Sequence, residues 1–165
     1  MGLQIIQGTP LAVWALLACL VVLGFSQTRE RVIGRRRAVL LPGVFLLLSL
    51  AGVVNAFGSQ AMALAAWTIG AGMALTLGGQ MLPRLQATWH PASDTLQVAG
   101  SWLPLALILS LFAVKYAAGA SLAMHPRLAS QTDFVAACNL AYGLFSGLFA
   151  ARGRQLWQVR AAPRV

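Results

Sequence analysis

The stretch from Trp102 to Met124 restricts the fold of this chain more than any other feature of the sequence. It contains 23 residues and is almost wholly apolar apart from Lys115. A helix of this length crosses the hydrocarbon core of a bilayer with some tilt. A lysine ammonium at that depth costs roughly 2.5 to 17 kcal/mol, depending on the reference state. The chain therefore either uses Lys115 or shields it.

The composition predicts the same environment for the rest of the chain. Of its 165 residues, 59% are apolar and only 9% are charged, whereas an ordinary soluble domain has about 25% charged residues. So few charges cannot cover a surface in water, and a chain of this length is too short to hide so much apolar surface in one core. The sequence therefore predicts an integral membrane protein.

Five apolar segments have the length of membrane-spanning helices. The predicted fold is an all-α, five-helix transmembrane bundle in a single domain of residues 1–165, with spans at about 10–26, 38–57, 61–79, 102–124 and 134–150. Only the tripeptide Gly58–Gln60 separates the second span from the third. Because this connection is so short, those two helices are expected to be antiparallel neighbours.

The segment between the third and fourth spans predicts a small element of β-structure. Apolar and polar residues alternate on both sides of the turn-forming cluster Pro91–Asp94, with the apolar positions at Leu85, Ala87, Trp89, Leu96 and Val98. This pattern is typical of a short hairpin, in which residues 85–90 pair with residues 95–99. An irregular loop is the alternative.

The net charge of +9 gathers on one side of the predicted membrane. Ten of the twelve Lys and Arg residues fall in the connections and tail of one side, and Arg127 is alone on the other. This bias predicts a periplasmic N-terminus and a cytoplasmic C-terminus, with the hairpin on the cytoplasmic side. Nucleic-acid binding is not expected, because no aromatic residues interleave with the first basic cluster. That cluster is instead expected to contact anionic lipid headgroups through Arg29, Arg31, Arg35, Arg36 and Arg37.

Lys115 is the main candidate for a functional residue. Small residues one turn away, such as Ala118 and Gly119, let a second helix approach and indicate that Lys115 faces the bundle. Lys115 lies nine residues before Met124, about 14 Å along a helix, which matches the level of Tyr142 in the fifth span. The candidate ligand-binding residues are Lys115, Tyr142, Asn139 and Asn55.

No acidic residue lies in any predicted span, so the sequence offers Lys115 no obvious counterion. Three outcomes stay open. The amine is neutral because burial disfavours its charged form, or it snorkels outward toward Asp133, or it binds an anionic ligand.

Small residues predict close packing in two of the helices. They recur every fourth position in the third span and form a GxxxG pattern in the fifth, at Ala66, Gly70, Ala74, Gly78, Gly143 and Gly147. Such stripes let helix backbones approach each other. We expect these stripes to contact other helices of the same monomer, and contact between two copies in a dimer is the alternative.

Familiar catalytic and cofactor-binding patterns do not occur in the sequence. His90 and His125 fall on opposite sides of the predicted membrane, so they cannot share a metal or a haem. Cys19 and Cys138 lie in different spans. No Ser-His-Asp set, phosphate-binding glycine loop or carboxylate pair is evident. We therefore expect no metal and no cofactor, and the sequence favours a protein that is not an enzyme.

Several short motifs resemble a family of small, uncharacterised proteobacterial inner-membrane proteins, known as a domain of unknown function. The motifs are Gly8-Thr9-Pro10 with residues 14–17, Gly100–Leu107, Val114–Ala117 and Ala141–Gly147. The resemblance covers the whole chain. It implies a location in the bacterial inner membrane and carries no known activity or catalytic residues.

Three functions are compatible with these observations. The first is a non-enzymatic membrane component, such as an accessory or scaffold protein, with lipids and either a membrane partner or a second copy as its partners. The second is a small-molecule or anion carrier that uses Lys115. The third is a membrane enzyme that acts on a lipid-soluble substrate.

Overall fold

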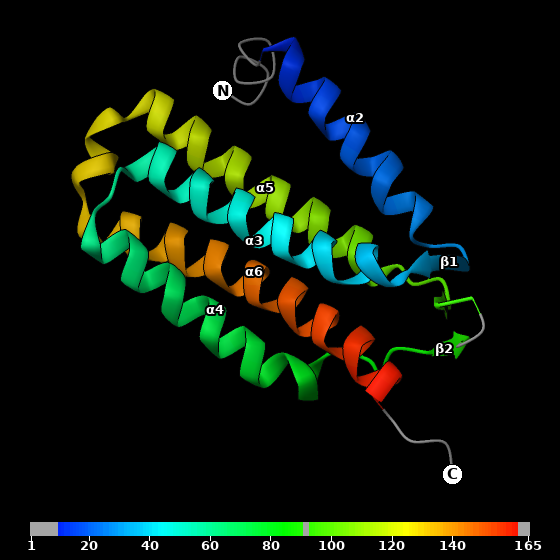
Figure 1. Ribbon diagram of the computed structural model, residues 1–165. Coiled ribbons are helices and arrows are strands. Elements are labelled where there is room, and N and C mark those ends of the chain that lie inside the picture. The colour runs from blue at the N-terminus through cyan, green and yellow to red at the C-terminus, as the bar shows by residue number, and fades with distance from the viewer. Residues whose placement is uncertain (1–9, 91–92, 162–165) are drawn as a thin grey trace. The chain divides into compact units, whose positions relative to one another are not determined.

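The computed structural model describes residues 10–90 and 93–161, without the side chains of residues 35–39, 41–42, 81 and 160–161. These residues contain five α-helices, one 3₁₀ helix and three short strands (Figure 1). In chain order the elements are α2 (Leu11–Ser26), β1 (Arg31–Gly34), α3 (Arg35–Phe57), α4 (Ala61–Met81), β2 (Ala87–His90), β3 (Thr95–Val98), α5 (Leu103–Met124), η1 (Pro126–Ser130) and α6 (Thr132–Ala161).

A helix occurs at each of the five predicted positions, but two boundaries differ by three residues or more. Helix α3 begins at Arg35, and α6 continues past residue 150 to Ala161. The residues that follow the apolar part of α6 include Arg, Gln and Leu, which are good helix formers, so the helix does not end where the apolar run ends. Three helical segments are long and apolar enough to cross a membrane, Ala61–Gln80, Leu103–Met124 and Thr132–Val159, whereas Leu11–Ser26 and Gly43–Phe57 are apolar but shorter.

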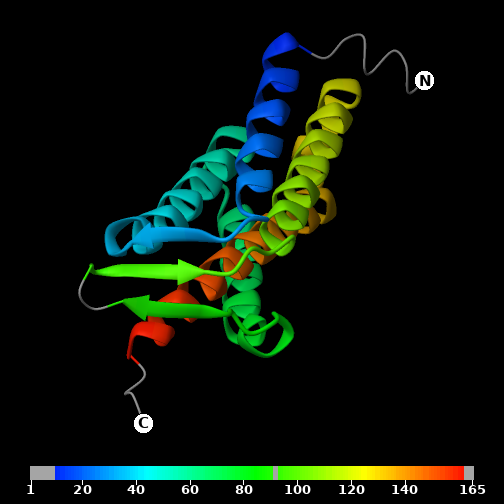
Figure 2. The ribbon, with the colours of Figure 1, turned by 90° about the vertical axis from the view of Figure 1, so that its right-hand side faces the viewer.

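The predicted hairpin is present as β2 and β3, but the prediction of only two strands was wrong. Strand β1, from the basic connection after α2, pairs with β3 and gives an antiparallel sheet in the order β1-β3-β2 (Figure 2). Three strands are more stable together than an isolated hairpin. Pro91 and Ala92 of the predicted turn lie outside the described residues, and Asp94 has a left-handed φ of 48°, which Asp tolerates better than most residues.

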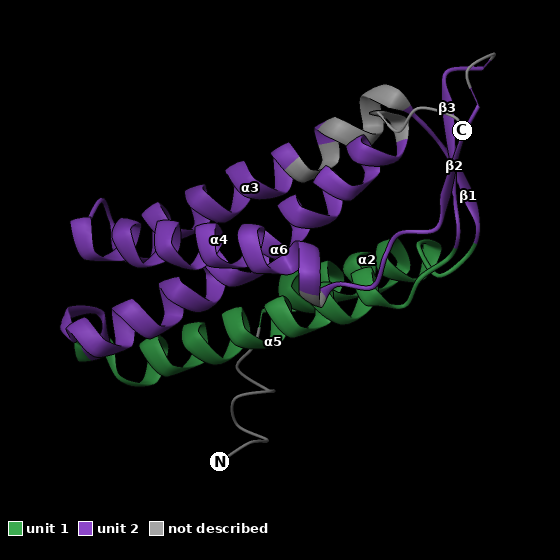
Figure 3. Ribbon diagram, turned by 90° about the horizontal axis from the view of Figure 1, so that it is seen from below, with its two compact units in different colours: residues 1–29, 100–127 green, residues 30–99, 128–165 purple. Residues whose placement is uncertain are grey.

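The chain divides into two compact units (Figure 3). The first consists of residues 1–29 and 100–127 and contains α2 and α5. The second consists of residues 30–99 and 128–165 and contains the sheet, α3, α4 and α6.

In the second unit, the most extensive packing joins α4 to α6. A Cβ atom at Gly143 would collide with the Trp67 carbonyl oxygen, and one at Gly70 would collide with the Leu140 carbonyl oxygen. Gly147 approaches the Ala71 backbone in the same way. The order of these contacts makes α4 and α6 parallel, and it confirms that the small-residue stripes pack inside the monomer.

Helix α3 runs antiparallel to both of these helices. Its Ser49 meets Trp67 and Ser146, and its Phe45 ring stacks on Phe149 at 5.3 Å between centroids. The predicted antiparallel pairing of α3 with α4 is therefore confirmed. Their mutual contact is nevertheless smaller than the contact that either helix makes with α6.

In the first unit, α2 and α5 are joined mainly at one end. Gly24, the only buried residue of α2, lies against Leu105. The Phe25 and Trp102 rings meet edge to face at 6.2 Å between centroids. In the adjoining loops, the backbone N–H of Ser101 donates to the Gln27 carbonyl at 3.0 Å.

Many large aliphatic side chains on the helices of the second unit face outward, with Leu47, Leu48 and Ile69 exposed by 69%, 62% and 57%. The buried positions include polar residues, Ser49, Ser146 and Asn139, beside apolar ones such as Val53 and Val135. Small and polar residues at helix contacts and aliphatic residues outside are typical of helices surrounded by lipid.

Candidate functional site

The four predicted ligand-binding residues fall in different compact units. Lys115 belongs to the first unit, and Asn55, Asn139 and Tyr142 belong to the second. The two sets are therefore described separately below.

Lys115 lies in the second half of α5 and is partly buried. On the same helix, the rings of Phe112 and Tyr116 are nearly parallel, at 6.1 Å between centroids. Lys115 makes an interaction of its own within the structure, so it is not an isolated charge.

Asn139 and Tyr142 are both in the buried core of the second unit, on the inner face of α6. Asn139 has no exposed surface, and its Nδ2 atom donates to the Val135 carbonyl at 2.7 Å. Its Oδ1 atom is also buried and accepts no hydrogen bond from any residue that the structure describes. Asn55, by contrast, is exposed near the end of α3.

A buried hydrogen-bonded cluster beside these residues was not predicted from the sequence. The Ser146 hydroxyl donates either to Ser49 Oγ at 2.7 Å or to the Tyr142 carbonyl at 2.8 Å. Trp67 Nε1 donates to Ser49 Oγ at 3.2 Å. The members come from three helices, so no local spacing in the sequence could have revealed the cluster.

The predicted lipid-binding arginines lie in different elements of the structure. Arg29 belongs to the first unit, where its guanidinium lies 5.9 Å from the centre of the Phe25 ring. Arg31 is in β1, and burial lowers the pKa of its guanidinium. Arg35, Arg36 and Arg37 form the first turn of α3, and their side chains lie outside the described part of the chain.

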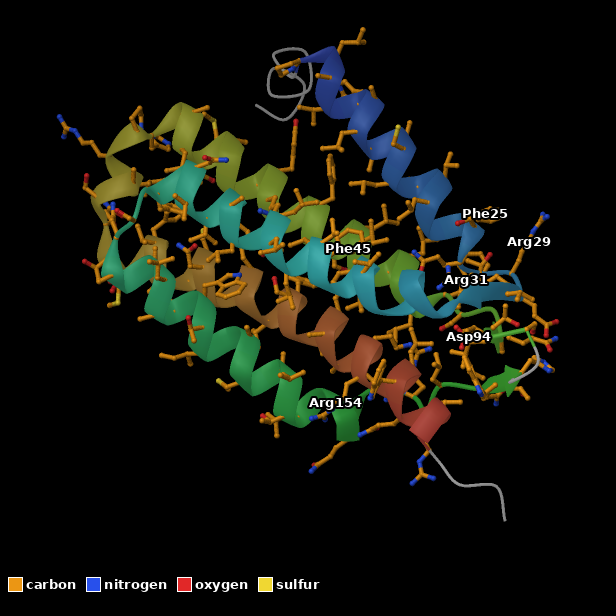
Figure 4. All side chains as sticks on the ribbon, in the orientation of Figure 1. Phe25, Arg29, Arg31, Phe45, Asp94 and Arg154 are labelled. Atoms are coloured by element: carbon orange, nitrogen blue, oxygen red, sulfur yellow. The ribbon has the colours of Figure 1, made fainter. Side chains whose placement is uncertain are left out.

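Two further arginines near the end of α6 lie beside the connection that follows α4. Arg152 Nη1 donates to the Pro83 carbonyl at 2.8 Å and to Gln155 Oε1 at 3.0 Å. Arg154 lies next to the last turn of α4 (Figure 4). If Gly79 in that turn had a Cβ atom, the atom would be 2.9 Å from Arg154 Nη2. The sequence suggested these arginines only as topology determinants.

A chain of polar side chains crosses the exposed face of the sheet. Gln97 on β3 donates through Nε2 to Glu30 Oε1 at 2.7 Å, and its Oε1 lies 3.0 Å from His90 Nε2 on β2. These contacts link the residue just before β1 to β3 and β2 on the exposed face.

The comparison with protein families identifies the family of this chain. The model of DUF6622, a family of unknown function, matches residues 1–164. The chain belongs to the DUF6622 family. The predicted membership in an uncharacterised family is thereby confirmed. No curated protein and no solved structure matches the chain.

Two of the polar features of this DUF6622 protein differ in kind. One is the neutral hydrogen-bonded cluster of Ser49, Trp67 and Ser146 between α3, α4 and α6. The other is the arginine-rich end next to the sheet. Groups of three or more His, Cys, Asp or Glu side chains suited to a metal do not occur in the part of the chain that the structure describes. Cys19 and Cys138 are free thiols.

Proposed function

We propose that this DUF6622 protein is a non-enzymatic, integral protein of the bacterial inner membrane that serves as an accessory or scaffold component. The observation that carries the proposal is the packing of α4 against α6. Glycines bring the two helix backbones into direct contact at Gly70, Gly143 and Gly147. Backbone contacts of this kind make a fixed bundle, which suits a protein that positions other components.

The exposed aliphatic surface of the second unit supports the membrane location. Its outer helix surfaces carry Leu47, Leu48 and Ile69, which would be unfavourable in water and favourable against lipid chains. We infer five membrane crossings, with the N-terminus in the periplasm and the C-terminus in the cytoplasm. The two shorter apolar helices can cross because a short span is accommodated by local thinning of the bilayer and by snorkelling of flanking residues.

Two single-cysteine variants test this topology in a background without Cys19 and Cys138. Val32 is 64% exposed on β1 and would be cytoplasmic, and Arg127 is exposed in η1 and would be periplasmic. A membrane-impermeant maleimide added to intact cells should label Arg127→Cys and leave Val32→Cys unlabelled. Labelling in the opposite pattern would reverse the topology, and recovery of the protein from aqueous extracts without detergent would remove the membrane assignment.

The scaffold role predicts a stable protein neighbour, which is either another membrane protein or a second copy. A photoreactive residue at the outward-facing positions Leu47 and Ile69 should give a discrete cross-linked product in cells. The same residue at Val53, which has no exposed surface, is the matched control and should give none. The proposal fails if a scan of exposed helix positions gives no protein adduct and the purified chain is a monomer in nanodiscs.

A small-molecule carrier is the second candidate, and Asn139 favours it. A buried amide oxygen without a donor is costly, by about 1–3 kcal/mol, and a solute with an N–H or O–H group could supply the missing donor. For the carrier that uses Lys115, Lys115→Met should abolish uptake in proteoliposomes while the purified protein stays folded. Uptake equal to that of the parent would exclude the carrier that uses Lys115.

A further inference from the structure

The first unit carries a small cluster of exposed side chains at the end where α2 finishes and α5 begins. The Arg29 guanidinium lies over the Phe25 ring, 5.9 Å from the ring centre (Figure 4). The Phe25 ring in turn meets the Trp102 ring edge to face, at 6.2 Å between centroids. Phe25 is 47% exposed and Trp102 is 67% exposed, and Arg29 is exposed as well. These three side chains, called the aromatic–arginine cluster below, therefore contact one another and still present much of their surface.

The two loops behind the aromatic–arginine cluster are held together by their backbones. The Ser101 N–H donates to the Gln27 carbonyl at 3.0 Å. A Cβ atom at Gly100 would collide with the Thr28 carbonyl oxygen, so the two backbones are in direct contact there. The arginine and the tryptophan of the cluster directly follow Thr28 and Ser101 in the chain. The backbone therefore fixes where these two side chains begin.

Arg29 is not needed to complete the C-terminus of α2. The last carbonyls of a helix lack partners inside the helix, and a nearby arginine often binds them. In α2, however, the carbonyls of residues 23–25 already accept hydrogen bonds from residues 26–28, at donor–acceptor distances of 2.7 to 3.0 Å. Capping of the helix therefore does not explain the position of Arg29.

An ion pair within the unit does not explain Arg29 either. Residues 1–29 and 100–127 contain no Asp or Glu. Glu30, the next residue in the chain, accepts a hydrogen bond from Gln97 Nε2 at 2.7 Å. The Arg29 guanidinium donates to no residue that the structure describes, and the same is true of the Trp102 indole N–H. The cluster therefore offers exposed donors and a positive charge to a ligand.

These donors stand next to an apolar surface, which favours a lipid as the ligand. A guanidinium can bind two oxygens of a phosphate at once. Tryptophan is enriched at the boundary between headgroups and acyl chains, because its ring is apolar and its N–H is polar. Along α2 the surface beside the cluster continues with Val22 and Leu23, which are 71% and 41% exposed. A phosphate at Arg29 would therefore have its acyl chains beside aliphatic side chains.

We propose that Phe25, Arg29 and Trp102 bind the headgroup of an anionic phospholipid. Arg29 donates to the phosphate oxygens, and the Phe25 ring supports the guanidinium from one side. The Trp102 indole supplies a further donor at the level where the acyl chains begin. A net negative headgroup matches a unit whose Asp, Glu, Lys and Arg side chains are all basic. The site rests on the membrane location proposed above and is independent of the scaffold role.

The test offers two lipids to the purified full-length protein in a non-ionic detergent, and native mass spectrometry measures the lipid that is retained. Phosphatidylglycerol and phosphatidylethanolamine both contain a phosphate, but only the first has a net negative charge. Arg29→Gln removes the charge, Arg29→Lys keeps the charge without the planar fork, and Trp102→Leu removes the ring and its N–H. Arg127→Gln is the matched control, because it removes an exposed arginine of the same unit beyond the other end of α5.

The parent should retain phosphatidylglycerol in preference to phosphatidylethanolamine. Arg29→Gln should weaken the binding of phosphatidylglycerol on the order of ten-fold, as expected for the loss of a charge-assisted hydrogen bond. Arg29→Lys should weaken it by less, and Trp102→Leu should weaken it roughly three-fold, as expected for one neutral hydrogen bond. Arg127→Gln should leave it unchanged.

Melting temperatures separate a lipid site from a purely structural cluster. Without lipid, Arg29→Gln should melt at the parent temperature, because surface substitutions have little effect on stability. Added phosphatidylglycerol should then raise the melting temperature of the parent and of Arg127→Gln by more than that of Arg29→Gln. If Trp102→Leu does not fold, Arg29→Gln decides the question alone.

Several results would overturn the proposal. They are a parent without a preference for phosphatidylglycerol, retention by Arg29→Gln equal to that of the parent, an equal loss of both lipids in Arg29→Gln, and an equal loss in Arg127→Gln. If the protein is found in membranes, each of these results removes this site and leaves the membrane location standing. Recovery of the parent from aqueous extracts without detergent would instead overturn the membrane location together with the site.

Discussion

The two compact units of this chain are built on different kinds of helix contact. In the second unit, three glycines of α4 and α6 bring backbone against backbone, and the polar residues Ser49, Asn139 and Ser146 lie buried between the helices. In the first unit, α2 buries only Gly24, and its Leu11 and Val22 are exposed by 85% and 71%. The contact there depends on a few large side chains at one end.

This difference predicts a difference in local stability. Dispersion forces grow with the number of close atomic contacts. The line of close contact between α4 and α6 at Gly70, Gly143 and Gly147, called the glycine seam below, gives many such contacts along its whole length. A unit joined at one end opens more easily, because few contacts must be broken together. We therefore expect the second unit to be the rigid part of the molecule and the first to be the part that opens at lower free energy.

The largest expected effect comes from filling the seam of the second unit. Gly143→Leu would drive a side chain into the Trp67 backbone, which cannot move without displacing α4. We expect a loss of about 3 kcal/mol or more in the free energy of unfolding, at the upper end of overpacking effects. Thermal unfolding of the purified variant in detergent measures it.

A matched control comes from a glycine in the same unit with open space around it. A Cβ atom at Gly72 would meet nothing within 4 Å. Gly72→Ala should therefore leave stability unchanged or raise it by roughly 0.5–1 kcal/mol through helix propensity. If Gly143→Leu is tolerated as well as Gly72→Ala, the seam is not what holds the unit together.

The same type of clash in the first unit should cost less. A Cβ atom at Gly100 would collide with the Thr28 carbonyl oxygen. Both residues lie in loops, so the backbone can shift more easily than in a helix pair. We expect Gly100→Leu to lower stability by about 1–2 kcal/mol, within the usual range for overpacking. A loss as large as that of Gly143→Leu would contradict the proposed contrast between the units.

The sequence predicted the helices well because each is encoded locally. The apolar runs, the three-residue connection before Ala61 and the small-residue stripes all report on nearby positions, and the structure agrees with each. Strand β1 was missed for the opposite reason. Val32 and Ile33 are its only large apolar residues, and their partners on β3 lie more than 60 residues away in the chain.

The polar residues also divide into those that the local sequence points to and those that it does not. Lys115 and Asn139 stood out because each is polar within an apolar run, and Asn139 is indeed fully buried. Ser49, Trp67 and Ser146 gave no such signal, since serine and tryptophan are ordinary in membrane helices. Their significance depends on three helices that meet at one level, which a single sequence cannot show.

The smallest predicted effect concerns the hydrogen bond between Ser49 and Ser146, and a double-mutant cycle measures it. Ser49→Ala also leaves Trp67 Nε1 without its acceptor, whereas Ser146→Ala removes a hydroxyl that has the Tyr142 carbonyl as a second acceptor. Ser49→Ala should therefore be the more destabilising of the two single variants. The coupling energy should fall near 0.6 kcal/mol and not exceed about 1.7 kcal/mol, the range found for hydrogen bonds between membrane helices. A coupling of zero would mean that the cluster adds nothing to the packing of α3 against α6, and that the glycine seam of α4 and α6 alone sets the second unit apart from the first.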